Sequence, residues 1–293
     1  MRKKASLCIY LILCLLLVVC NNLKKQDSDA DKGSSTIQTL SGSEANKLSL
    51  LLQSRNEYQL GTNCDLQGNI KVHLFFVDDQ ESRWDRDTVE QFTSKQILPG
   101  LHFLENEAKR YGVALDFSVE SHTTGSKTGT PIIYEGNISK SKNHTLDIPT
   151  KIVGQFGCED ADQMYTKLYA QNDHNEVIFL FLVNKDGVSY AVTQGDGDFY
   201  HPYLEFGVVF KRHLDKDFGI DDNTHPAASV AHEILHTYGA IDMYTPIEVK
   251  KLLKPIYPRD IMLLDYLNIE DMEVGSYTAY SVGWINQAPT GAS

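Results

Sequence analysis

The sequence predicts a fold of the α+β or α/β class, because apolar runs typical of strands alternate with longer segments whose apolar residues recur three or four apart. The run 177–183 (VIFLFLV) is the most continuously apolar stretch outside the N-terminus, as expected for a central strand covered on both faces. Of the 293 residues, 42% are hydrophobic and 10% aromatic, which is ordinary for a packed soluble domain. A sizeable core can therefore form.

The first expected strand is 70–77, which is β-branched and aromatic. It is followed at 87–111 by a long amphipathic pattern that indicates a helix, and Pro99 should kink that helix or split it in two. Apolar and polar residues alternate over 113–119, as in a half-buried strand. The remaining elements expected before residue 220 are a strand at 131–134, a helix at 159–171, the central strand at 177–183, and short strands at 189–193 and 206–210.

The N-terminus has the pattern of an export signal. Three basic residues at positions 2–4 precede an apolar run over 5–19, which is short for a permanent membrane span. We therefore predict that residues 1–20 are a signal peptide and that the protein acts outside the cytoplasm.

The end of this leader, Leu17-Val18-Val19-Cys20, resembles the lipobox of bacterial lipoproteins, in which the cysteine becomes the lipidated first residue. The resemblance implies lipidation at Cys20 and a bacterial protein held at the cell surface. Val19 departs from the pattern, since a small residue is usual there. Simple cleavage with secretion, or an uncleaved anchor, are the alternatives.

Residues 21–43 are rich in Lys, Asp, Ser, Gln and Gly and cannot bury enough apolar surface to fold, so we predict a disordered tether. A single domain is then expected over 44–293. The formal net charge of −12 argues against nucleic acid or an anionic lipid surface as the main partner, because both require clustered Lys and Arg. Membrane contact is expected only through the N-terminal anchor, and the sequence gives no indication of the oligomeric state.

Two of the five cysteines, Cys64 and Cys158, lie outside the leader. In an oxidising compartment an even pair can form a disulfide. Two separate buried thiols explain the sequence equally well, and neither cysteine lies in a nucleophile motif or has the spacing of a metal knuckle.

The candidate site is the segment 228–244, which contains His232-Glu233-Ile-Leu-His236 and then Gly239 and Asp242. Residues four apart on a helix are offset by about 40° and about 6 Å along the axis, so both imidazoles can face one metal ion. Zinc takes neutral histidine nitrogens and carboxylate oxygens, and a catalytic zinc keeps one position for water. Glu233 would face that water, and Gly239 can end the helix in a left-handed conformation that returns Asp242 toward the metal.

This segment resembles the motif His-Glu-x-x-His-x-x-Gly-x-x-His of the metzincin zinc peptidases, in particular the snapalysin-like branch, in which Asp replaces the third His. The resemblance implies one catalytic Zn²⁺ held by His232, His236 and Asp242, with Glu233 as general base. It also implies a methionine turn beneath the metal, and Asp260-Ile261-Met262 fits this turn after a short helical segment at 246–253. Met262 as an ordinary core residue is the other interpretation.

The implied fold is zincin-like, with long helices, an active-site helix, a methionine turn and a twisted, mostly parallel sheet that has one antiparallel edge strand. Residues 189–193 are the candidate for that edge, which would bind an extended substrate by adding it as a strand. The implied activity is that of an extracytoplasmic metalloendopeptidase with a protein or peptide substrate.

Two other functions compete with this one. In a zinc peptidase of the gluzincin type, the third ligand would be a downstream glutamate, Glu248 or Glu270, but such a ligand needs no tight turn at Gly239. The chain could instead be a non-catalytic surface lipoprotein that binds a protein or a glycan, although a binding module has no need of Glu233. Separately, the stretch 195–198 (GDGD) could bind calcium, but it lacks a twelve-residue loop pattern and a solvated turn is the favoured interpretation.

Overall fold

The computed structural model describes residues 63–123, 131–140, 145–170, 176–193, 204–213, 226–245, 247–263, 268–287 and 289. The chain divides into two units, 1–36 and 37–293, and all the described residues belong to the second. The predicted signal peptide with Cys20, the tether and the candidate calcium stretch lie outside the described residues. Within the described ranges no helix has the length and apolar character needed to cross a membrane.

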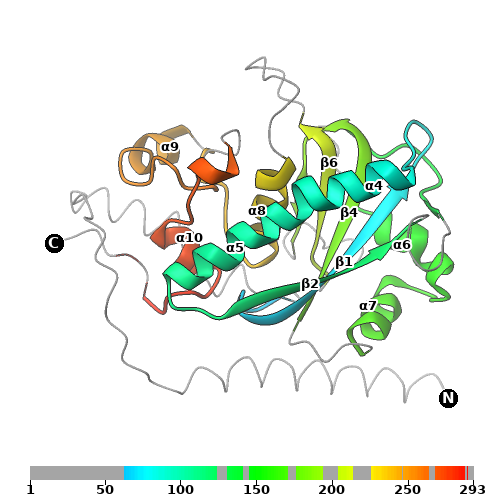
Figure 1. Ribbon diagram of the computed structural model, residues 1–293, viewed down its shortest axis with the longest axis horizontal. Helices are drawn as coiled ribbons and strands as arrows, with labels where there is room; N and C mark the ends of the chain where they lie inside the picture. Colours follow the sequence, from blue (N-terminus) through cyan, green and yellow to red (C-terminus); the bar gives the residue numbers. More distant parts are fainter. Residues whose placement is uncertain are drawn as a thin grey trace. The chain divides into compact units, whose positions relative to one another are not determined.

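The fold is α+β, with a mixed, mostly parallel sheet in the strand order β2-β1-β4-β6-β5 (Figure 1). Neighbouring strands run parallel except β5, which is antiparallel to β6 and lies at the end of the sheet. The antiparallel edge strand predicted at 189–193 is therefore present. The strands are β1 (Gly68–Asp78), β2 (Leu115–His122), β3 (Ile132–Ile133, paired with the end of β1), β4 (Glu176–Gly187), β5 (Tyr190–Val192) and β6 (Phe206–His213).

The central position of β4 explains its composition. It pairs with β1 on one side and β6 on the other, and Val177 through Val183 are all buried. A strand enclosed on both faces cannot alternate polar with apolar residues, which is why this run is continuously apolar. β2 is at the opposite end of the sheet from β5, and its half-buried pattern agrees with the alternation in its sequence.

One face of the sheet is covered by the long helical segment predicted from the sequence, together with the helix that carries the two histidines. The long segment is interrupted just before Pro99 by a π-helical turn. A second α-helix begins at Leu98, and Pro99 lies in its first turn, where its missing N–H is tolerated. The elements on this face are α4 (Arg86–Phe92), the π turn η2 (Thr93–Ile97), α5 (Leu98–Arg110) and α8 (Pro226–Thr237) (Figure 1).

The C-terminal elements join the same apolar core and complete it around α8. They are α9 (Ile247–Leu253), the 3₁₀ turn η4 (Ile269–Asp271) and α10 (Ser276–Ser281). The short helix expected at 246–253 is thus present.

The other face of the sheet has its own core. The helix expected at 159–171 is α7 (Ala161–Ala170), which covers this face with Met164 and Leu168 buried. A second short helix, α6 (Ile148–Ile152), and the 3₁₀ turn η3 (Val153–Phe156) also pack there and were not expected, because five and four residues are too short for a periodic pattern. Alternate residues of β1, such as Leu74 and Phe75, enter the two cores separately.

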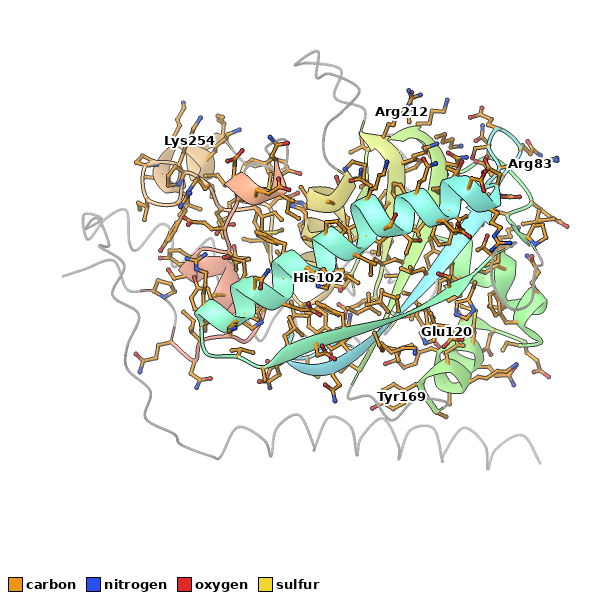
Figure 2. All side chains as sticks on the ribbon, viewed as in Figure 1. Arg83, His102, Glu120, Tyr169, Arg212 and Lys254 are labelled. Atoms are coloured by element: carbon orange, nitrogen blue, oxygen red, sulfur yellow. The ribbon has the colours of Figure 1, made fainter. Side chains whose placement is uncertain are left out.

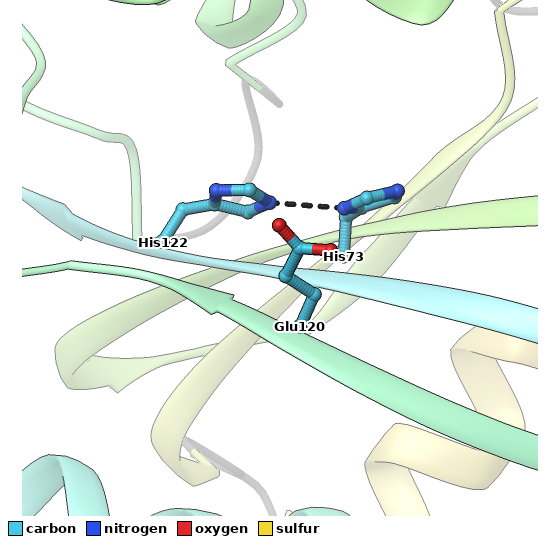
Figure 3. Close-up of side chains that lie close together, drawn as sticks. All are labelled: His73, Glu120 and His122. Atoms are coloured by element: carbon cyan, nitrogen blue, oxygen red, sulfur yellow. Dashed lines mark hydrogen bonds between the residues drawn. The ribbon is translucent and has the colours of Figure 1, made fainter. Parts of the chain in front are cut away.

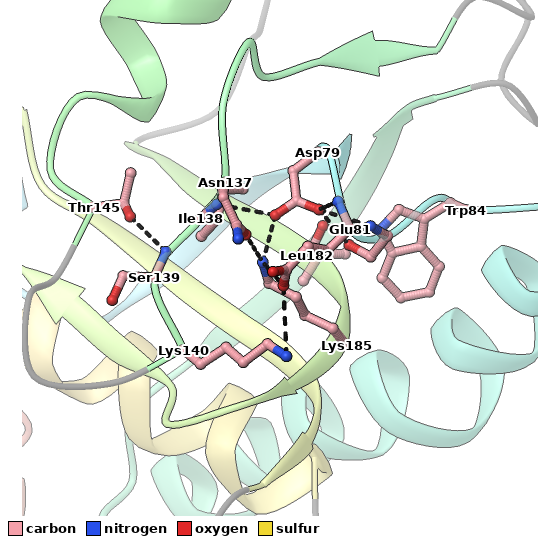
Figure 4. Close-up of polar contacts among 11 residues, drawn as sticks. Asp79, Glu81, Trp84, Asn137, Ile138, Ser139, Lys140, Thr145, Leu182 and Lys185 are labelled. Atoms are coloured by element: carbon pink, nitrogen blue, oxygen red, sulfur yellow. Dashed lines mark hydrogen bonds and ion pairs between the residues drawn. The ribbon is translucent and has the colours of Figure 1, made fainter.

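A buried carboxylate fixes the loop after β1 (Figure 4). The Asp79 side chain accepts hydrogen bonds from the backbone N–H groups of Ser82 and Ile138 and forms an ion pair with Lys185. Burial acts to raise the pKa of Asp79, but Lys185 and the N–H donors outweigh it, so the pKa is lowered overall. This network joins the ends of β1 and β4 to the loop 136–140.

The two cysteines in this unit do not form a disulfide. Cys158 is buried beside α7, and its thiol donates a weak hydrogen bond to the Phe156 carbonyl, whereas Cys64 precedes β1 and its N–H is bonded to Glu176. Of the two interpretations of the sequence, the separate thiols are present and the disulfide is not. An even count indicates pairing only where the fold brings the two Cβ atoms together, and spacing along the sequence carries no such information.

Candidate metal centre

The helix that carries the two histidines is almost wholly enclosed. α8 begins at Pro226, whose missing N–H costs nothing in a first helical turn, and nearly all of its residues are buried. It lies against β5 and β6 on one side and against α5 and η2 on the other. Such a helix has little freedom to move, so the direction of its side chains is fixed by packing.

The start of α8 is held by the long helical segment. The N–H of Ala227, which has no acceptor within its own helix, donates to the Gln96 side chain of the π turn at 3.1 Å. Gly100 of α5 lies close by, and a Cβ there would stand only 2.6 Å from the Ala227 carbonyl oxygen. The two helices therefore approach each other at a point where only glycine fits.

The end of α8 is a tight turn built on Gly239. This glycine has φ of 89°, a left-handed conformation that other residues rarely adopt. Its N–H bonds to the His236 carbonyl at 2.9 Å and that of Ala240 to the Leu235 carbonyl at 3.0 Å, so the last helical carbonyls are satisfied. The chain then reverses, and Asp242 returns to the histidines as the sequence predicted.

Three ligand atoms meet at this point. The Nε2 atoms of His232 and His236 lie 3.0 Å apart, and one Asp242 oxygen, Oδ1, lies 3.1 Å from the first and 3.2 Å from the second. Tetrahedral zinc with bonds of about 2.0–2.1 Å would separate its ligand atoms by about 3.3 Å. The triangle is therefore close to the size that zinc requires, and of the described carboxylates Asp242 alone is grouped with this histidine pair.

The other nitrogen of each ring faces a backbone carbonyl. His232 Nδ1 donates to the Ile261 carbonyl at 3.1 Å and His236 Nδ1 donates to the Ala240 carbonyl at 2.7 Å. The Nε2 atom of each ring is left facing the Asp242 carboxylate. Nδ1 atoms fixed in this way are the usual support of metal-binding histidines.

Asp242 is the charged member of the group. Burial acts to raise its pKa, but the two imidazoles outweigh burial and hold the pKa well below its usual value. Asp242 is therefore a carboxylate at neutral pH. The side chains of His232, His236 and Asp242 are 3%, 16% and 29% exposed, so the centre is closed on the His232 side and accessible on the Asp242 side.

Glu233, the expected general base, is buried beside the metal ligands on α8. Gly207 of β6 faces it closely, since a Cβ at position 207 would lie 3.3 Å from the Glu233 Cβ. The Tyr244 ring stacks near His232, with 6.4 Å between the ring centroids. Neither Gly207 nor Tyr244 is part of a sequence motif, and the sequence analysis did not identify them.

Met262 lies in a turn that contacts α8 and the segment after it. It is fully buried, and its carbonyl accepts the N–H of Met243 at 2.8 Å, which joins the turn to the segment just after Asp242. The carbonyl of the preceding residue, Ile261, is the one that orients His232. The turn therefore supports a ligand directly, whereas the sequence predicted only a methionine floor.

A buried carboxylate, Asp260, organises this turn, a role that the sequence did not indicate. It accepts the N–H of Met262 at 2.8 Å, the N–H of Gly275 at 2.8 Å and the hydroxyl of Thr278 at 2.9 Å. Burial raises the pKa of Asp260 to about 6, against the lowering effect of these donors. Asp260 thereby holds the turn against the start of α10.

The two glutamates considered as other third ligands do not join the centre in the described part of the chain. Glu270 is exposed on η4 and is not grouped with the histidines. The side chain of Glu248 lies outside the described residues.

Comparison with known proteins adds no relative: no protein-family model, no curated protein and no solved structure matches the chain.

Proposed function

We propose that the chain is a zinc-dependent endopeptidase of the metzincin type, with His232, His236 and Asp242 as metal ligands. The observation that carries the proposal is the meeting of three possible ligand atoms, two Nε2 and one Oδ1, within 3.0–3.2 Å of one another. These separations are close to the distance of about 3.3 Å between neighbouring ligand atoms of tetrahedral zinc. Two neutral imidazoles and one carboxylate are ligands that zinc prefers.

Bound zinc would supply a Lewis acid that activates water and polarises the scissile carbonyl. Glu233 accepts a proton at its carboxylate and then delivers it to the leaving amine. Glu233 follows His232 on the buried helix α8, and a Cβ at Gly207 would lie 3.3 Å from its Cβ. The hydrogen bonds from both Nδ1 atoms to backbone carbonyls fix the orientation of the imidazoles.

The proposed substrate is an extended segment of a protein or peptide. β5 lies at the end of the sheet, antiparallel to β6, and contacts α8. A polypeptide added along β5 would form backbone hydrogen bonds with it and would pass beside α8. An export leader ending in a lipobox would place this activity at a bacterial cell surface or in the medium.

The proposal is tested by Glu233→Gln, which keeps the shape of the side chain and removes the base. We expect hydrolysis of a labelled unstructured protein to fall by about 10²–10⁴, the usual contribution of general acid–base catalysis, while zinc content is retained. Hydrolysis and zinc are measured on the same purified full-length chain.

Glu270→Gln is the matched control, because Glu270 is exposed and is the described residue of the gluzincin alternative. It should leave zinc content and hydrolysis unchanged. Full activity in Glu233→Gln would reject Glu233 as the base. Stoichiometric zinc without cleavage of any peptide in a diverse library would favour the non-catalytic binding protein.

A further inference from the structure

A second group of metal-ligating side chains lies on the sheet. β1 and β2 pair in parallel with His73 opposite Glu120 and Phe75 opposite His122. Since side chains alternate between the faces of a sheet, His73, Glu120 and His122 all project from the same face. Ligand atoms of the three residues lie within 4.8 Å of one another (Figure 3).

The two imidazoles are in direct contact and are held by aromatic packing. His73 Nδ1 and His122 Nε2 are 2.9 Å apart. The His122 ring stacks on Phe75 with 4.9 Å between centroids, and Phe156 meets it edge-on at 5.5 Å. His73 is buried and meets the edge of Phe179. This packing restricts the orientation of both rings, which lowers the entropy lost when a metal ion binds.

Glu120, the third residue of the group, supplies a negative charge and a side that is open to solvent. The side chain of Glu120 is 47% exposed, and its carboxylate lies beside the two rings in Figure 3, while the nearest cation, Lys71, is 3.8 Å away. A half-exposed carboxylate can turn between Lys71 and a metal ion.

This group is separate from the candidate metal centre. Phe75 and Phe179, which contact its rings, belong to the core on the α7 face, whereas α8 belongs to the core on the opposite face. No residue is shared between the two groups. A metal ion here would therefore not take part in the chemistry at Glu233.

We propose that His73, Glu120 and His122 form a second binding site, for Zn²⁺ or another divalent transition-metal ion, that joins the edge strand β2 to β1. Two imidazoles and one carboxylate suit zinc and its neighbours rather than calcium or magnesium, which prefer oxygen ligands. The exposed side at Glu120 leaves room for a water as the fourth ligand. Because the three residues lie on two strands, the role of this site is to hold the strands together.

The test is a zinc count on the full-length chain after dialysis against buffered zinc. His122→Ala should hold one zinc ion fewer than the wild type, because the remaining His73 and Glu120 cannot retain the metal. His102→Ala is the matched control: His102 is an exposed histidine on α5 with a single carboxylate partner, Glu105, and its removal should leave the count unchanged (Figure 2). An equal count in His122→Ala and the wild type would overturn the proposal.

Glu120→Gln is a second variant that tests the site even if His122→Ala fails to fold. Glu120 is partly exposed and glutamine keeps its shape, so this variant should fold normally. Zinc titration against a chelating dye should show one binding event weakened by about tenfold or more, with the other unchanged. Unaltered binding in Glu120→Gln would mean that the two histidines are simply hydrogen-bonded to each other. Each variant of the sheet group is compared with the wild type. The conclusion about this group therefore does not depend on whether the α8 centre binds zinc.

Discussion

The two groups of possible metal ligands, one at the end of α8 and one across β1 and β2, differ in how their carboxylates are held. On α8, Asp242 Oδ1 lies 3.1 and 3.2 Å from the two Nε2 atoms, and both Nδ1 atoms donate to backbone carbonyls. On the sheet, the rings of His73 and His122 are in contact at 2.9 Å, but Glu120 is half-exposed and pairs with Lys71. The helix group therefore needs less rearrangement to hold a cation, and we expect it to bind zinc more tightly.

The sharpest test of this difference is Asp242→Asn. Asparagine keeps the shape of the ligand but offers a neutral oxygen to a dication, so zinc affinity at the α8 centre should fall by more than about 100-fold, beyond the loss usual for outer-sphere partners. The competition titration described for Glu120→Gln gives the comparison. Equal losses in Asp242→Asn and Glu120→Gln would show that the two groups do not differ as the hydrogen bonds indicate.

A smaller effect is expected when a hydrogen bond to Asp260 is lost. Asp260 holds the turn that supports His232 in the α8 centre, and no such carboxylate is described beside the sheet group. Thr278→Val removes the hydroxyl that donates to Asp260 at 2.9 Å while keeping the side-chain volume. The free energy of unfolding at pH 8 should fall by about 1.5–3 kcal/mol, the usual range for a hydrogen bond to a charged group. Urea unfolding monitored by circular dichroism measures it.

The same variant has a defined pH dependence. Burial raises the pKa of Asp260 from 3.8 to about 6, so its contribution to stability is greatest below pH 3.8 and declines as the pH rises toward 6, where the buried group ionises. The Thr278 hydroxyl donates a hydrogen bond that stabilises the ionised form of Asp260 more than its protonated form. Thr278→Val should therefore cost less at pH 5 than at pH 8, and an equal cost at both would contradict the assignment.

The smallest effect concerns the turn that returns Asp242. Gly239→Ala places a side chain at φ of 89° and should lower the free energy of unfolding by about 1–2 kcal/mol. Gly154→Ala is the control, because Gly154 has an ordinary φ and a Cβ there would meet nothing within 4 Å. Thermal unfolding compares the two, and similar melting temperatures would show that the left-handed turn is not under strain.

Much of the fold could be predicted from the sequence because its signals are local. The continuous apolar run of β4 and the alternation in β2 each reflect the number of covered faces, and both strands are present. The α8 group could be predicted for the same reason. His232 and His236 are one helical turn apart, and Gly239 permits the turn that brings Asp242 to them.

The features that were missed depend on distant parts of the chain. His73 and His122 are 49 residues apart and meet only through the register of two parallel strands, which no local pattern specifies. Asp260 is surrounded by donors from α10, and a single aspartate in a turn gives no sign of that. The kink or split expected at Pro99 corresponds to a π turn just before it, a form that the sequence did not predict, and this turn is tied to the start of α8 through Gln96.

The close contact at Gly100 makes the position of α8, and so of its two histidines, depend on a residue of α5. A methyl group at this position would stand 2.6 Å from the Ala227 carbonyl oxygen and would push α8 away. His232 and His236 would then move together relative to the Ile261 carbonyl, and the geometry of the centre would change without any change of ligand. If α8 holds zinc as proposed, selection for zinc affinity would also act on a glycine in a different helix, and directed evolution could adjust the site from there.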